Sequence, residues 1–180
     1  MAWMLVLPIR RWIISPQVLA DRLGLTPSDE VLELGCGPGY FSAEIARRVP
    51  AGHVHLADIQ PEMLEKARAR LTRAGCTNAT FTVTDAAGLP YADASMDVAF
   101  LVTVLGEISD PAAALRELHR VLRPGGTLSI TEAAGDPGLR DPAALDALLG
   151  PAGFERTATA GGRRAATSTY RRSQADHGEA

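Results

Sequence analysis

Short apolar runs alternate with amphipathic helical patterns from about residue 16 onward, and this alternation limits the chain to few architectures. Helices are predicted over 41–49 and 61–71, and further ones begin at Ser15-Pro16, Asp110-Pro111 and Asp141-Pro142. Strands are predicted at 31–34, 54–57, 80–83, 97–102 and 127–131, with two weaker candidates at 154–158 and 166–170. The alternation indicates an α/β fold, a mostly parallel sheet with helices on both faces.

The length of 180 residues suits one compact domain. Apolar residues make up 46% and charged residues 22% of the chain, which excludes intrinsic disorder. We expect an apolar, helical segment at 1–24 that covers a pocket, a main domain at 25–172 and a polar tail at 173–180. The net charge of −3 argues against a nucleic-acid partner. Cys36 and Cys76 are too few for a cysteine-rich metal site, so we expect no bound metal.

Residues 1–14 are apolar, but a proline and two arginines interrupt the run. A transmembrane helix needs about 20 apolar residues, and no basic region precedes the run as in a signal peptide. We therefore expect a cytoplasmic protein. One interpretation is that this segment packs on its own domain; the alternative is weak contact with a membrane surface, favoured by Trp3 and Trp12.

The motif Glu33-Leu34-Gly35-Cys36-Gly37-Pro38-Gly39-Tyr40 lies between a predicted strand and a predicted helix. Glycines at such a position let the backbone turn sharply and approach a ligand closely. A dinucleotide fingerprint requires Gly or Ala three positions after Gly37, where this chain has Tyr40. Glu33, at the strand end, would repel a pyrophosphate and suits a ligand that carries an ammonium group.

Two further carboxylates follow the next two predicted strands. Asp58 lies 23 residues after Gly35, and its two oxygens match a pair of vicinal ribose hydroxyls. Asp85 could accept a hydrogen bond from an adenine amino group, or it could cap the following turn as an Asx side chain. Three carboxylates on successive strand ends predict a cationic nucleoside ligand without phosphate.

The glycine loop, Asp58-Ile59-Gln60-Pro61-Glu62-Met63-Leu64, the segment 85–99 and the segment 118–126 together resemble the class I S-adenosylmethionine-dependent methyltransferases. The chain is most similar to the small-molecule branch that includes the ubiquinone/menaquinone C-methyltransferases. The resemblance covers about residues 25–135. It implies a Rossmann-like, seven-stranded sheet whose last strand is antiparallel, with S-adenosylmethionine as the cofactor.

The resemblance also implies which residues hold the cofactor. The methionyl part would be held by Glu33 and by the loop at Gly35, Cys36, Gly37 and Gly39. The nucleoside would be held by Asp58 at the ribose, Ile59 against the adenine, Asp85 at the adenine amino group and the Ala86 amide at the ring. Thr103 would lie near the sulfonium. Within the loop we interpret Cys36 as a small packing residue rather than a nucleophile, because no histidine accompanies it.

Glu107 is the candidate catalytic residue, as a base or a substrate-binding group; a helix-capping or solvated role is the alternative. Relatives often carry histidine near the positions of Gly106-Glu107, whereas this chain has Glu107 there. Proton transfer by a histidine at this place is therefore not expected. The favoured hypothesis is methyl transfer to a small-molecule or lipid-like acceptor by in-line displacement. The alternative is a cofactor-binding regulator or partner subunit without catalysis. A homodimer, in which a second copy completes the substrate site, is compatible with both.

Overall fold

A computed structural model of the chain describes residues 14–133, 141–162 and 164–174. The strands are β1 (Glu30–Leu34), β2 (His53–Asp58), β3 (Ala79–Val83), β4 (Met96–Val102), β5 (Leu122–Ala133), β6 (Phe154–Gly161) and β7 (Ala165–Arg172). The helices are α2 (Pro16–Leu23), α3 (Ser42–Arg48), α4 (Pro61–Arg73), α5 (Pro111–Val121) and α6 (Pro142–Leu149). Two 3₁₀ helices, η1 (Leu105–Glu107) and η2 (Gly150–Ala152), complete the described elements.

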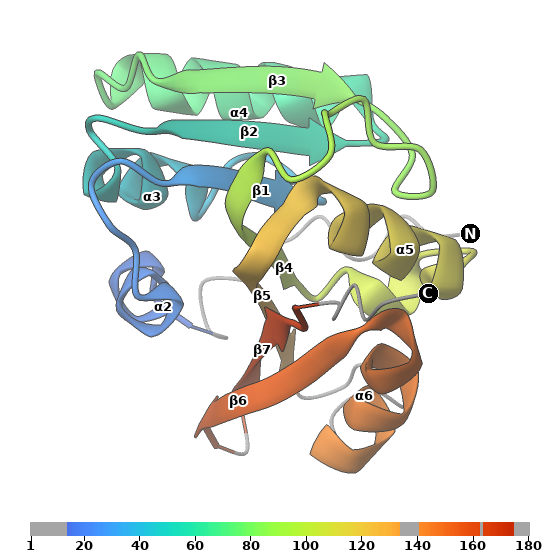
Figure 1. Ribbon diagram of the computed structural model, residues 1–180. Helices are drawn as coiled ribbons and strands as arrows, with labels where there is room; N and C mark the ends of the chain where they lie inside the picture. The colour runs from blue at the N-terminus through green and yellow to red at the C-terminus, as the bar shows by residue number, and fades with distance from the viewer. Residues whose placement is uncertain (1–13, 134–140, 163, 175–180) are drawn as a thin grey trace.

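The seven strands form one sheet in the order β3-β2-β1-β4-β5-β7-β6, which runs from top to bottom in Figure 1. Neighbouring strands from β3 to β5 are parallel, whereas β7 is antiparallel to both β5 and β6. The predicted mostly parallel sheet with an antiparallel last strand is confirmed. The strand order reverses between β1 and β4, and ligands of such sheets bind at the carboxyl ends of the strands next to this reversal.

Helices cover both faces of the sheet, as predicted. The core on one face contains side chains of α2, α3 and α4, and the core on the other face contains side chains of α5 and α6 (Figure 1). Three of these helices begin at the predicted caps: the side chains of Ser15, Asp110 and Asp141 accept hydrogen bonds from the first turns of α2, α5 and α6. The capping residue followed by proline therefore marked these three starts correctly.

Strand β5 is longer than the predicted run 127–131, and it already includes Pro124-Gly125-Gly126, which the sequence placed before the strand, as the end of the helix that begins at Asp110-Pro111. Leu122 already pairs with Met96 of β4, and the next pair joins Thr127 to Val98. The proline and the two glycines therefore lie inside the strand, as an irregularity in its pairing with β4. Gly125, with φ of +75°, adopts a backbone conformation that side chains disfavour. A Pro-Gly-Gly sequence is compatible with a turn or with such a bulge.

The predicted pocket cover comprises residues 1–24, of which the structure describes 14–24. The predicted membrane contact involves residues 1–14 and so lies almost entirely outside the described residues. Ile14 is buried in the core beneath α2. Arg22 of α2 donates to the Thr167 hydroxyl of β7 over 2.8 Å, and this hydroxyl lies 2.9 Å from that of Thr131 on β5. The helix is therefore tied to the sheet by polar as well as apolar contacts. Within the described residues, no helix has the length and apolar character needed to cross a membrane.

We expect His119 of α5 to make the stability of the fold depend on pH in mild acid. Its ring packs edge-on against Phe154, with centroids 5.5 Å apart, and burial lowers its pKa, assisted by the positive charge of Arg172. Because the unfolded chain binds a proton at about pH 6.5, stability is lost as the pH falls below that value. His119→Gln should therefore reduce the drop in thermal unfolding midpoint between about pH 7.5 and about pH 5.5.

Circular dichroism melts of both proteins across this pH range would measure the effect. Burial lowers the pKa of His53 as well, so part of the pH dependence should remain in the variant. Equal pH dependence of the two proteins would contradict the assignment to His119.

Candidate functional site

The glycine loop lies directly at the carboxyl end of β1. The amides of Gly35 and Cys36 both donate to the Ala57 carbonyl of β2, over 2.8 Å and 3.2 Å. Gly35, Gly37 and Gly39 have φ angles of +71°, +53° and +70°. Other residues adopt this left-handed conformation only at a cost. The three glycines therefore allow the chain to fold the loop tightly over the ends of β1 and β2.

Two of the glycines are also packed too closely to carry a side chain. A Cβ atom on Gly35 would lie 2.5 Å from a methyl group of Val104, which follows β4. A Cβ atom on Gly39 would lie 2.9 Å from the Ala67 side chain of α4. Both distances are well below van der Waals contact. The loop is thus clamped between the segment after β4 and helix α4, so its shape is set before any ligand binds.

Asp58 joins this loop to the end of β2. Its side chain is buried, and its Oδ2 accepts a hydrogen bond of 2.8 Å from the Gly37 amide. Its Oδ1 accepts a hydrogen bond of 2.9 Å from the Gln60 amide at the start of α4. A carboxylate has about four lone-pair sites, so each oxygen can accept one more donor. The remaining capacity suits two adjacent hydroxyls.

Glu33, at the end of β1, places a second buried carboxylate under the loop. Its side chain is only 3% exposed, and it accepts a hydrogen bond from the Ser42 hydroxyl in the first turn of α3. A buried carboxylate is stable only with such partners. The position fits the ammonium group that the family resemblance implies.

Two exposed apolar side chains flank Asp58. Ile59 is 61% exposed, and Val83, which pairs in register with Asp58, is 56% exposed. Large apolar side chains at neighbouring strand ends offer a surface for a flat, weakly polar ring. The sequence predicted this role for Ile59 only. Val83 was missed because its relation to Asp58 depends on the register between β2 and β3.

Asp85 follows β3 and is exposed. Its Oδ1 accepts a hydrogen bond of 2.9 Å from the Ala87 amide, so the Asx turn that was the alternative reading is present. The turn uses one oxygen. Among the described residues no partner occupies Oδ2, so the turn and a role in binding an amino group are compatible. Ala86 lies within the same turn.

Thr103, immediately after β4, has the unusual φ of +54°. Its amide donates to the Thr131 carbonyl of β5 over 2.8 Å, which holds the residue in place. A β-branched residue in this conformation costs about 1–3 kcal/mol, and such strain clusters at functional sites. Glu107 lies farther along the same connection, in η1, with an exposed side chain.

The predicted cofactor residues therefore lie at or just after the carboxyl ends of β1, β2, β3 and β4. Direct hydrogen bonds join Gly35 to β2 and Gly37 to Asp58, while Glu33 lies under the same loop. Ile59 follows Asp58, and Asp85 follows the neighbouring strand β3. The loop with two closely packed glycines, the two buried carboxylates and the exposed apolar surface are compatible with the methionyl, ribose and adenine parts of the expected cofactor.

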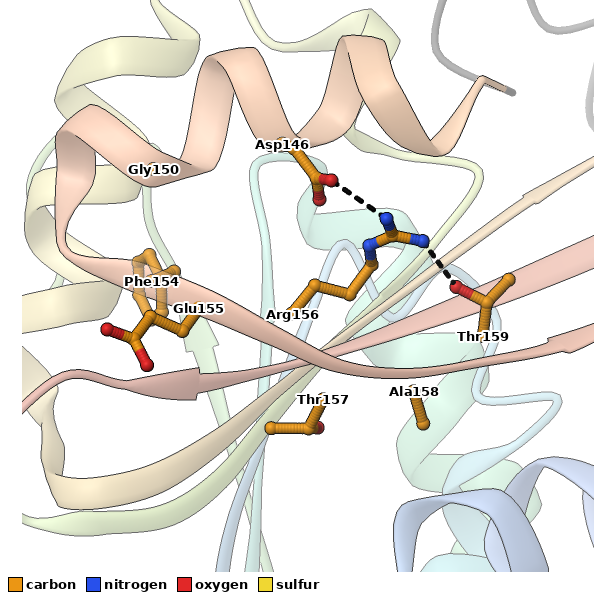
Figure 2. A pocket seen from close by; sticks show the side chains of 8 residues that line it. All are labelled: Asp146, Gly150, Phe154, Glu155, Arg156, Thr157, Ala158 and Thr159. Atoms are coloured by element: carbon orange, nitrogen blue, oxygen red, sulfur yellow. Dashed lines mark hydrogen bonds and ion pairs between the residues drawn. The ribbon is translucent and has the colours of Figure 1, made fainter.

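A hollow that the structure shows lies elsewhere. It has a volume of about 520 Å³ and lies between α6 and β6, at the far edge of the sheet from the glycine loop (Figure 2). Two of its charged side chains pair with each other, since Arg156 contacts Asp146 at 2.9 Å, and Arg156 also contacts the Thr159 hydroxyl at 3.1 Å. It contains none of the predicted site residues. Across the described part of the chain, no three histidine, cysteine or acidic side chains cluster as metal ligands.

Comparison with known proteins adds independent findings. The sequence profile of a family described as "Methyltransferase domain" matches residues 31–126, more than half of the chain. The chain is 38% identical over 111 residues to the ubiquinone/menaquinone biosynthesis C-methyltransferase UbiE of Hydrogenovibrio crunogenus. It is 40% identical over 116 residues to an uncharacterized 37.1 kDa protein in transposon TN4556 of Streptomyces fradiae.

These alignments cover 61% and 64% of this chain but only 44% and 33% of the two relatives. The chain thus spans less than half the length of either relative. Among solved structures, a SAM-dependent methyltransferase from Aquifex aeolicus superposes with a TM-score of 0.82 at 23% identity, covering 93% of this chain and 95% of that one. At this identity, the structural likeness concerns the fold.

Proposed function

The chain belongs to the class I S-adenosylmethionine-dependent methyltransferases, and from this membership we propose that it transfers a methyl group to a small-molecule or lipid-like acceptor. The observation that carries the proposal is the bond between Asp58 and Gly37. It joins the carboxylate expected to hold a ribose to the loop expected to hold the methionyl part. One preformed unit would therefore bind both halves of the cofactor.

When bound, S-adenosylmethionine supplies a methyl group on a sulfonium sulfur, whose departure leaves a neutral thioether. The chain's task is then mainly to bind and align. Glu33 and the loop amides would orient the amino-acid part, and Asp58 would orient the ribose. Thr103, held rigidly by Thr131, would line the place where the acceptor approaches. Alignment of this kind can contribute about 7–11 kcal/mol to lowering a barrier.

The proposed acceptor class is supported by the relatives. The name of the Hydrogenovibrio protein states a role in ubiquinone and menaquinone biosynthesis, which favours a small, lipid-like acceptor. The exposed Glu107 is the proposed base or acceptor-binding group, because it lies on the connection that begins at Thr103. A base is needed only where the attacking atom must first lose a proton.

Incubation of the purified protein with methyl-labelled S-adenosylmethionine and cell extract tests the proposal. We expect label in the small-molecule or lipid fraction, and suppression of the transfer by excess S-adenosylhomocysteine. Label in protein or RNA would contradict the acceptor class. Binding of the cofactor without transfer to any fraction would favour the non-catalytic alternative.

A further inference from the structure

The segment 84–95, which connects β3 to β4, carries Asp85 and Ala86 and contains neither a helix nor a strand. Two of its turns are closed internally, by the Asp85 side chain and by a bond from the Gly88 amide to the Asp85 carbonyl. Backbone groups of such a segment need partners elsewhere in the protein or in water. At the Asp85 end, the Thr84 amide donates to the Asp58 carbonyl over 3.1 Å and the Thr84 hydroxyl donates to the Gly88 carbonyl over 2.9 Å. The path of residues 89–95 depends on other partners.

Several of these partners belong to one residue of α5, Arg120. Its guanidinium donates to the carbonyls of Leu89 and Tyr91 over 2.9 Å and 2.8 Å, and to the Asp93 carboxylate over 2.7 Å. Its own carbonyl accepts a hydrogen bond of 2.9 Å from the amide of Ala94, which has a φ of +51°. One residue thus holds the segment at four points.

Glu117, one turn earlier on α5, fixes the orientation of this arginine. Its two oxygens each accept a hydrogen bond of 2.8 Å from the Arg120 guanidinium, and Oε2 also accepts one of 2.8 Å from the Leu89 amide. Arg120 lowers the pKa of Glu117, so the carboxylate stays charged. A planar guanidinium bound in this fork has little freedom to turn.

We propose that Arg120, oriented by Glu117, is a positioning residue for adenine recognition, because it holds the segment 84–95 with Asp85 and Ala86 turned toward the cofactor. The inference rests on the proposed function, which assigns the adenine to these two residues. Arg120 is proposed to act through the segment and not by direct contact with the ligand. Its side-chain bonds outside α5 all reach this one segment, so its loss should act locally.

The test compares Arg120→Ala and Arg120→Lys with Arg48→Ala as a matched control. Arg48 also pairs with two carboxylates, Glu44 and Asp21, but it lies on α3, away from the segment. The first readout is hydrogen–deuterium exchange of residues 84–95 without ligand. The second is the calorimetric preference for S-adenosylhomocysteine over S-inosylhomocysteine. The inosyl analogue presents an oxygen to Asp85 and an N–H to the Ala86 amide, so both expected hydrogen bonds are lost.

We expect the wild-type protein and Arg48→Ala to prefer the adenosyl ligand by at least about tenfold. The preference should fall below about threefold in Arg120→Ala, with faster exchange confined to the segment, and should be intermediate in Arg120→Lys. An unchanged preference in a cooperatively folded Arg120→Ala protein would overturn the inference alone. Failure of the wild-type protein to bind either ligand would overturn the proposed function and the inference together.

Discussion

Replacement of Asp58 with alanine should abolish most of the affinity for S-adenosylhomocysteine, with a loss of about 100-fold or more. The carboxylate is expected to accept two ribose hydroxyls, and hydrogen bonds to a charged group contribute about 1.5–3 kcal/mol each. The same carboxylate holds the amides of Gly37 and Gln60. The variant therefore loses direct contacts and also the bond that links the two halves of the site.

Ligand-induced stabilisation measures this loss, because a bound ligand stabilises the folded protein by an amount that grows with the logarithm of the ratio of ligand concentration to dissociation constant. Asp110→Ala is the matched control: it removes a carboxylate that caps α5 through the Ala113 amide, at a cost of about 1 kcal/mol. We expect the ligand to raise the midpoint of the control but not that of Asp58→Ala. An equal rise in both proteins would contradict the role of Asp58.

The second large effect is expected at Gly35. An added methyl group would meet Val104 at 2.5 Å, and a φ of +71° disfavours any side chain. Overpacking costs about 1–3 kcal/mol and the backbone conformation about 1–2 kcal/mol more. Gly35→Ala should therefore lower the free energy of unfolding by about 3 kcal/mol, and it should weaken ligand binding because the loop must move.

Gly24→Ala separates the two causes of this effect. Gly24 has a similar φ of +62°, but a Cβ atom there would lie in open space, so only the backbone cost should appear. Val104→Ala combined with Gly35→Ala should recover part of the loss, because it removes the atoms in conflict. Urea unfolding of the three variants measures each contribution. Equal destabilisation by Gly24→Ala and Gly35→Ala would show that the contact with Val104 is unimportant.

The position of the glycine loop followed from local signals in the sequence. Glu33 is the penultimate residue of the run at 31–34, Asp58 directly follows the run at 54–57, and parallel strands bring their carboxyl ends to one edge. Glu33 and Asp58 could therefore be predicted to lie near the loop without any knowledge of distant contacts. The starts of α5 and α6 at Asp110 and Asp141 could be predicted in the same way, because a capping residue and a proline act within one helical turn.

The contacts that join distant segments could not be predicted in this way. The contact between Val104 and Gly35 depends on the pairing of β4 with β1, and the hydrogen bond from Arg120 to Leu89 depends on the packing of α5 against the sheet. The early start of β5 at Leu122 likewise depends on its pairing with Met96. No periodicity or spacing within the sequence marks such pairs. These contacts set the shape of the loop and of the segment 84–95, while the local motifs supply the groups that bind.

We propose that this chain binds S-adenosylmethionine at the ends of β1 and β2, and calorimetric titration of the purified chain with S-adenosylhomocysteine tests this binding most directly. We predict saturable binding at one site per chain, in the micromolar range or tighter. A protein that unfolds cooperatively, and is therefore folded, yet shows no saturable binding would contradict the claim.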